Sequence, residues 1–224
     1  MAKSFKTSAS YKVVKPAKNG SLESGFVYFK NVPVVYAKVQ ELVKKYQSED
    51  RNWELTCFID ADTMEAVEGM PINKGFAEVG KTKIKKGNNR GNLKYDPANE
   101  VYADYDGMFG FSIALPEFNK KGKPNELKVL GKDGKPITDL VGNGSICNIR
   151  CFAYRNRDEE LCITLDTIVV LELVEYAGNE GGDFFDDELG VAIPASTKKE
   201  AKKDDDLFDE DDAPFDTLDD EDEF

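Results

Sequence analysis

The last 21 residues of the sequence, 204–224, cannot form part of a folded core, so the fold must be built from the residues before them. This stretch holds 13 acidic side chains and no basic one. Like charges at this density repel one another, and there is too little apolar surface to offset the entropy lost on ordering. We therefore expect a folded domain at 1–182, a linker at 183–203 and a disordered acidic tail at 204–224.

Apolar side chains are distributed along the acidic tail, namely Leu207, Phe208, Phe215, Leu218 and Phe224. An aromatic ring in a flexible acidic segment can bind a basic groove that has an apolar pocket, through charge steering and one buried ring. A tail that only improves solubility is the alternative, and the aromatic residue at its end favours binding. The residues predicted to bind a partner are Phe208, Asp211, Asp212, Phe215, Asp222, Glu223 and Phe224.

The charge of the chain is divided unequally between the tail and the rest. The sequence has 43 acidic residues and 30 Lys and Arg, which gives a formal net charge of −13. Because the tail holds 13 of the acidic residues and none of the basic ones, residues 1–203 are neutral overall. A neutral body with a strongly acidic appendage suggests a surface for polyanions with a competitor in the same chain.

Missing residue types and segments exclude several classes of protein. Histidine is absent, which removes His-dependent triads, most zinc hydrolase sites and the usual general base near neutral pH. The four cysteines stand in apolar alternating runs without CxxC spacing, so we interpret them as reduced core thiols of a cytosolic protein rather than as a zinc site. The sequence shows no signal peptide and no apolar run long enough to cross a bilayer.

Alternating apolar residues predict a mainly β fold. The expected strands are 11–15, 25–30, 53–60, 107–115, 127–130, 145–155 and 161–176. Three- and four-residue spacing from Val35 to Tyr46 predicts one principal amphipathic helix. A short helix is expected to be capped by Asp62–Thr63 and stopped by Gly69. Short strands joined by Gly and Pro turns fit a small closed barrel better than a parallel α/β sheet.

Two segments of the body are basic and free of acid. Residues 1–20 contain five lysines, and residues 81–94 contain six basic residues and two glycines. We expect 81–94 to be a long mobile hairpin or loop, and the aromatic and acidic stretch 95–106 to be weakly structured. An ordinary solvated surface is the alternative for the lysines. Opposite charges segregated within one chain favour a polyanion-binding role instead.

The strand expected at 145–155 offers a cation and two rings on one face. Its inward residues are predicted to be Cys147, Ile149, Cys151 and Ala153, and its outward residues Asn148, Arg150, Phe152 and Tyr154. Single-stranded nucleic acid needs both cations for its phosphates and rings on which unpaired bases stack. Packing of the two rings under a loop or helix is the alternative. The predicted nucleic-acid-binding residues are Lys3, Lys12, Lys81, Lys83, Lys85, Lys86, Arg90, Lys94, Arg150, Phe152 and Tyr154.

Enzymatic chemistry has weaker support in the sequence. Glu100, Asp104 and Asp106 could form a two-metal nuclease site, but their spacing does not distinguish them from a solvated loop. The glycines at 87 and 91 lack the spacing and context of a phosphate-binding loop. We therefore expect no enzyme activity, no metal and no cofactor.

An ordered set of features connects the C-terminal half with a known family. These features are the Asp133-x-Lys135 turn, Asp139 before the segment 142–145, a strand at 170–174, an aromatic-acidic patch at 184–187 and an acidic tail ending in Phe. The opening Met-Ala-Lys, followed by an aromatic residue and Thr7-Ser8, adds to them. In these features the chain resembles the single-stranded DNA-binding protein of T-odd short-tailed bacteriophages.

The resemblance implies an oligonucleotide/oligosaccharide-binding (OB) barrel, that is, a mainly β, OB-fold-like Greek-key barrel whose groove takes single strands. It also implies an acidic tail that recruits the replicative DNA polymerase and helicase-primase and competes with DNA for the groove. Arg150 stands where the family has a lysine, whereas Cys151 stands where the family has an aromatic residue. A stacking role for Phe152 or Tyr154 is therefore our own inference from the residues.

Taken together, the sequence predicts a non-enzymatic single-stranded DNA-binding protein of phage DNA replication, recombination and repair. It would coat unpaired DNA without strong sequence preference in the cytoplasm of a bacterial host, without a membrane partner, and homodimer formation is left open. The alternative is an acidic DNA mimic or interaction protein that occupies a DNA-binding partner. A mimic spreads negative charge over a folded surface, so the neutral body disfavours it.

Overall fold

The structure is a computed structural model that describes residues 5–16, 23–44, 50–70, 72–87, 89–156 and 158–176, with the backbone alone at 184–186 and 191–193. Its strands are β1 (Ser8–Lys15), β2 (Ser24–Lys44), β3 (Arg51–Ile59), β4 (Ala77–Glu78), β5 (Phe109–Pro116), β6 (Lys128–Gly131), β7 (Ser145–Arg155), β8 (Leu161–Glu172), β9 (Phe184–Asp186) and β10 (Val191–Ile193). The helices are α1 (Ala61–Glu68) and the 3₁₀ turn η1 (Ala103–Tyr105). The chain divides into two units, Met1–Gly178 and Asn179–Phe224, and the second contains the antiparallel pair β9–β10.

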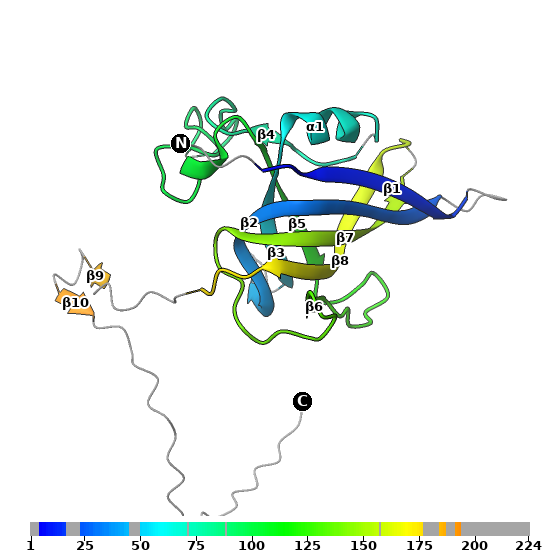
Figure 1. The fold of residues 1–224 in the computed structure, drawn as a ribbon. Helices are drawn as coiled ribbons and strands as arrows, with labels where there is room; N and C mark the ends of the chain where they lie inside the picture. Colours follow the sequence, from blue (N-terminus) through cyan, green and yellow to red (C-terminus); the bar gives the residue numbers. More distant parts are fainter. Residues whose placement is uncertain are drawn as a thin grey trace, which may run out of the picture. The chain divides into compact units, whose positions relative to one another are not determined.

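Five strands of the first unit form a Greek-key barrel. β2, β3 and β5 are successive antiparallel neighbours, and β7 returns to pair with β2, which is the strand order of a Greek key. β8 pairs with β7, and β6 adds a parallel strand at its edge. Figure 1 shows β1, β2, β7 and β8 side by side, with α1 above them.

The barrel is only partly closed. β5 and β8 approach each other on the remaining side, but among the described strands no ladder joins them. Partial opening is a known property of five-stranded OB barrels. The mainly β, OB-fold-like prediction is therefore confirmed, whereas the fully closed barrel expected from the strand pattern is wrong.

The helix predicted from Val35 to Tyr46 is also wrong, because residues up to 44 continue β2. The pairing of β2 with β3 shifts register twice, between Val35 and Lys38 and between Lys38 and Val43. Tyr36 has a φ of 49°, which breaks the alternation further. Because these irregularities interrupt the two-residue alternation of the strand, residues three and four positions apart can project to the same side of it. The β-branched valines of this segment favour an extended strand.

Inward alternation fills the main core. Alternate residues of β3, β5 and β7 are buried, namely Leu55, Cys57, Ile59, Phe111, Ile113, Leu115, Cys147, Ile149, Cys151 and Ala153. Trp53 and Phe109 pack at its margin. Each fully buried Leu, Ile or Phe side chain contributes about 1.5–3 kcal/mol of transfer free energy. The strands around this core are thereby fixed with one face inward and the other outward.

A second cluster forms where the sequence predicted weak structure. Tyr95 and Tyr105 are buried, and Tyr105 stacks on Phe58 with ring centroids 4.4 Å apart. A side chain at Gly110 would collide with the rings of Phe58 and Tyr95, since its Cβ would lie 2.7 and 2.5 Å from them. The tyrosines of 95–106 therefore pack on Phe58, on the side of β3 that faces away from the main core. The expectation of a weakly structured stretch is wrong, because its rings supply the apolar surface that anchors it.

Asp60 joins the N-terminal segment to α1. Its carboxylate accepts hydrogen bonds from the backbone N–H groups of Thr7 (2.8 Å) and Thr63 (2.7 Å). Asp60 is thus the N-cap, so the predicted cap at Asp62–Thr63 begins two residues too late, whereas Gly69 ends the helix as predicted. Partial burial alone would raise the pKa of Asp60, but the hydrogen bonds from Thr7 and Thr63 prevail and lower it.

Replacing this cap gives a pH-dependent loss of stability. Asp60→Ala is expected to lower the free energy of unfolding by about 1 kcal/mol near neutral pH, because two buried N–H groups lose their acceptor. Since the folded-state pKa is lowered, the stabilisation is complete above the unfolded pKa of about 3.9 and is lost as the pH falls through the folded value. Urea titrations of both proteins at neutral and at strongly acidic pH would measure this.

The matched control is Asp62→Ala, which removes an exposed carboxylate from the first turn of the same helix. It should change stability less. A difference between Asp60→Ala and the parent protein that stays the same at both pH values would contradict the assignment of Asp60 as an ionised cap.

Candidate nucleic-acid interface

The outward side chains of β1, β2, β7, β8 and β6 form one continuous surface, which we call the outer face. Residues directly opposite one another in neighbouring strands project to the same side of a sheet. One row across the strands is Lys12, Phe26, Phe152 and Thr164. The next row is Ser10, Tyr28, Arg150, Thr167 and Lys128. The ladder register therefore brings together cations and rings from segments more than 100 residues apart.

Aromatic rings occupy the centre of the outer face. Phe26 meets Phe152 edge to face, with centroids 6.1 Å apart, and also contacts Tyr28 at 6.5 Å. Tyr154 continues the group at 6.4 Å from Phe152. Phe152 is 42% exposed, so the alternative that it packs under a loop or helix does not hold for this ring. The partly exposed rings offer flat apolar surface to a ligand.

Arg150 lies between the rings and an acidic partner. Its guanidinium carbon is 4.9 Å from the centroid of the Phe26 ring, in cation–π geometry. Its Nε donates to Asp166 and its second amino group donates to the hydroxyl of Thr167 at 3.0 Å. The Arg150 side chain remains 39% exposed. The guanidinium is thus held beside a ring while part of the side chain faces solvent.

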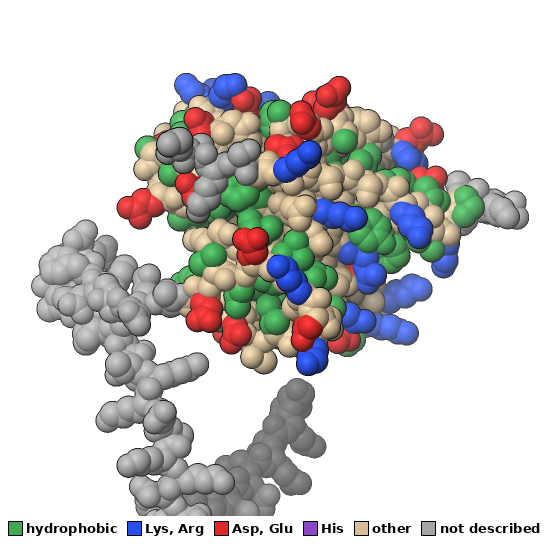
Figure 2. All heavy atoms as spheres, viewed as in Figure 1, with side chains coloured by type: hydrophobic (Ala, Val, Ile, Leu, Met, Phe, Trp, Pro, Cys, Tyr) green, Lys and Arg blue, Asp and Glu red, His purple; other side chains and the backbone are tan. Residues whose placement is uncertain are grey.

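Lys12 reaches this surface because β1 approaches β2 closely. Lys12 lies opposite Phe26, and its neighbour on the same ladder, Val13, lies opposite Gly25. A Cβ at Gly25 would lie 2.1 Å from the carbonyl oxygen of Lys12, so a larger residue there would push the strands apart. Figure 2, viewed from the side of β1, β2, β7 and β8, shows Lys and Arg side chains around apolar side chains on this surface.

Four residues of the outer face were missed by sequence reasoning: Phe26, Tyr28, Lys30 and Lys128. Phe26 and Tyr28 belong to a strand that was predicted, and alternation with the buried Val27 and Phe29 would have placed them outward. Their position opposite Arg150 and Phe152 depends on the pairing of β2 with β7, which spans the chain. No local signal carries that register.

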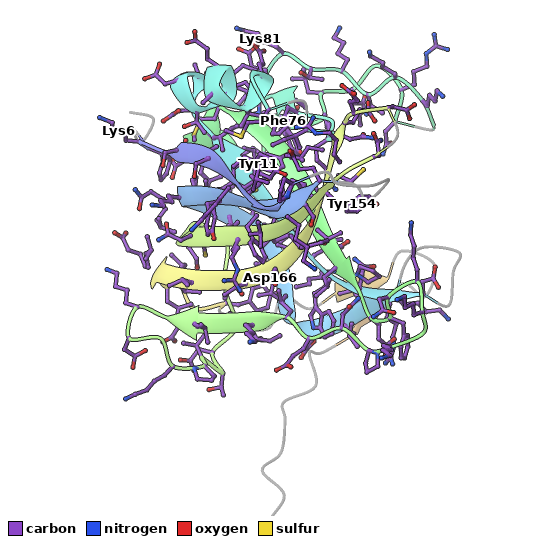
Figure 3. The ribbon with its side chains drawn as sticks, turned by 90° about the vertical axis from the view of Figure 1, so that its right-hand side faces the viewer. Lys6, Tyr11, Phe76, Lys81, Tyr154 and Asp166 are labelled. Atoms are coloured by element: carbon purple, nitrogen blue, oxygen red, sulfur yellow. The ribbon has the colours of Figure 1, made fainter. Side chains whose placement is uncertain are left out.

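The basic loop 81–94 lies apart from the outer face. Its backbone hydrogen bonds include Ile84 N–H to Asn92 and Thr82 N–H to Glu78, so it closes on itself and on β4. Lys81 pairs with Glu78, which raises the pKa of Lys81, whereas partial burial lowers the pKa of Lys94. Figure 3 shows Lys81 above α1, away from Tyr154 and Asp166.

The predicted binding residues thus fall into three sets. The structure brings Lys12, Arg150, Phe152 and Tyr154 together on the outer face. It places Lys81, Lys83, Lys85, Lys86, Arg90 and Lys94 in the separate loop, and their contact with nucleic acid stays a prediction. Lys3 and the tail residues Phe208, Asp211, Asp212, Phe215, Asp222, Glu223 and Phe224 lie outside the described residues.

Three of the four cysteines lie in the core, and one lies on the outer face. All four are free thiols, and Cys57, Cys147 and Cys151 are buried, as predicted. Burial raises the pKa of Cys147 to about 12. Cys162 differs from the prediction, because it is only partly buried and lies opposite Tyr154 on the outer face. Burial and contact with Cys162 raise the pKa of Tyr154.

Within the described residues no group of three or more Cys, Asp or Glu is arranged to hold a metal ion. In the same part of the chain no helix is long and apolar enough to cross a membrane.

Comparison with known proteins found similar solved structures. No protein-family model matches the sequence, and no curated protein matches it. The chain is similar to gp2.5, a single-stranded DNA-binding protein encoded by bacteriophage T7, with 14% identity and a TM-score of 0.43, over 70% of this chain and 91% of that one. It is similar to the single-stranded DNA-binding protein of bacteriophage Enc34 in complex with single-stranded DNA, with 15% identity and a TM-score of 0.37, over 75% and 99%. A C-terminal truncation of the Enc34 protein gives 15% identity and a TM-score of 0.35 over 73% and 97%.

The ion pair of Asp166 with Arg150 is expected to weaken polyanion binding by the outer face. Asp166→Asn is expected to elute from a heparin column at higher salt than the parent protein, because a negative charge beside Arg150 is removed. Glu65→Gln is the control, since it removes one exposed carboxylate from α1, off the outer face. Equal shifts for the two variants would show that the outer face is not where the polyanion binds.

Proposed function

We propose that the protein binds single-stranded DNA on the outer face, without catalysing a reaction. The observation that carries this proposal is the group of partly exposed rings in which Phe26 and Phe152 share a row with Lys12 and lie next to Arg150 in the neighbouring row. Cations attract the phosphates, and unpaired bases stack on the rings. Double-stranded DNA offers no free base faces, so this surface suits single strands.

Stacking makes the proposed binding tolerant of sequence. Every base has a π-face, and each base stacked on an aromatic side chain contributes about 1–3 kcal/mol. Of the polar groups near the rings, Asn148 already accepts a hydrogen bond from the backbone of Asn31, and Thr167 already accepts one from Arg150. Coating of unpaired DNA during phage-type replication, recombination and repair is the role that such binding fits.

Removing a ring should weaken binding without changing its salt dependence. Phe152→Ala is expected to lower affinity for oligo-dT about 5- to 150-fold, which corresponds to the loss of one stacked base. The slope of log K against log salt should stay near −3.5 in both proteins if about five phosphates are contacted. Quenching of Trp53 and tyrosine fluorescence at several salt concentrations measures both quantities.

Phe118→Ala is the matched control, because Phe118 is 52% exposed but lies beyond β5, off the outer face. It should bind as the parent protein does. A slope near zero for the parent protein would rule out capture of phosphates, and equal losses for both Phe variants would rule out the outer face as the stacking surface.

The acidic tail is proposed to act as a competitor and as a recruiter. Its 13 acidic residues can occupy a cationic surface in place of DNA, and its phenylalanines can anchor it in a replicative polymerase or helicase-primase. This part of the proposal is supported by composition and by the exposed cations of the outer face.

Truncation after residue 203 is therefore expected to tighten binding to oligo-dT at low salt. At high salt, where charge competition is screened, the affinities of the truncated and the full-length protein should differ less. The same truncation should abolish co-elution with the polymerase or helicase-primase. A second variant, in which every Asp and Glu of the tail is replaced by Asn or Gln and the phenylalanines are retained, separates competition from anchoring. Unchanged affinity of both variants at low salt would rule out the competitor role.

A further inference from the structure

A hollow continues the outer face beyond Asn148. It has a volume of about 710 Å³ and is lined by Phe5, Lys6, Tyr105, Lys132, Ile146 and Val174, among others. We call it the end hollow. Ile146 is the next outward residue of β7 after Asn148, and it pairs with Glu172 at the end of β8. The end hollow therefore lies on the same side of the sheet as Arg150 and Phe152.

One wall of the end hollow is apolar. The partly exposed ring of Phe5 lies 5.6 Å from the ring of Tyr105, which is buried and stacked on Phe58, so Tyr105 supports Phe5 from behind. Ile146 and Val174 add apolar surface, and Val174 is 46% exposed. A base could stack on Phe5 and contact these aliphatic side chains.

Lysines from two different segments stand at the end hollow. Lys6 comes from the segment before β1, and Figure 3 shows it beyond the start of that strand, pointing outward. Lys132 comes from the turn after β6. One carboxylate, that of Glu172, also lines the end hollow. Two cations against one anion favour a ligand that carries negative charge as well as an apolar ring.

We propose that the end hollow binds a nucleotide of the single strand whose other bases stack on the outer face. The base lies against Phe5, which Tyr105 supports from behind, and the phosphates on either side of it lie near Lys6 and Lys132. This inference rests on the proposed function, because it extends the same path. The inference also gives the course of the bound DNA, which would run from the rings of β2 and β7 along β7 and end near Ile146.

The path has a length that can be tested with oligonucleotides. Phe152 and Ile146 are separated by six residues of β7, which corresponds to about 20 Å along an extended strand. Short oligonucleotides would cover the rings alone, and longer ones would also fill the end hollow. The sites of OB folds span about 4–16 nucleotides, so an oligo-dT series over that range includes both cases.

The experiment compares Lys132→Ala with Lys135→Ala in the full-length chain over this oligo-dT series. Both lysines are in the turn after β6, but Lys135 is not among the residues that line the end hollow, and its side chain is 82% exposed. Lys132→Ala should weaken the longer oligonucleotides about fivefold at 0.1 M salt, the contribution of one phosphate contact, and leave the shortest unchanged. Lys135→Ala should bind like the parent protein at every length.

Photo-crosslinking locates the base directly. Oligo-dT that carries 5-iodouracil at one position at a time should crosslink to Phe5 when the substituted base is near one end of the bound strand. Crosslinks at Phe26 or Phe152 with none at Phe5, together with equal binding by Lys132→Ala and Lys135→Ala, would overturn this inference and leave the proposed function standing. Absence of any oligo-dT binding by the parent protein would overturn both.

Discussion

The pairing of β2 with three other strands is the interaction on which the rest of the structure depends. β2 contacts β1 and β7 through its first half and β3 through its second half, so one strand belongs to both sides of the barrel. It can do this because two register shifts and the positive φ of Asn31 and Tyr36 bend it. Tyr36 is supported in that conformation by Asn143, whose side chain accepts a hydrogen bond from its backbone N–H at 2.7 Å.

The same pairing creates the candidate interface. Because inward side chains must fill the core, the alternate side chains of β1, β2, β7 and β8 face outward together. In most antiparallel sheets this second face is simply polar. Here it carries phenylalanines and tyrosines, and Arg150 is held among them by Phe26, Asp166 and Thr167. The single-strand binding proposed for this surface depends on these rings and cations lying side by side.

The sequence predicted the individual strands and the inward alternation of β3, β5 and β7, since both are encoded at period two within each strand. It also identified Arg150, Phe152 and Tyr154 as a row. It failed at β2 beyond Val35, where bulges imitate a helical period, and at 95–106, where polar residues conceal tyrosines that pack on Phe58. In both cases a contact distant in sequence overrode the local pattern.

By itself, the sequence determined the mainly β class, the neutral body and the acidic tail, because periodicity and charge are properties of the chain alone. Only the tertiary structure decided which cations share a surface with Arg150. It joined Lys12, Phe26 and Lys128 to that surface and placed the loop 81–94 elsewhere. The physical reason is that ladder register is set by hydrogen bonds between strands far apart in the chain, and a shift by one residue would turn every ring on the outer face toward the core.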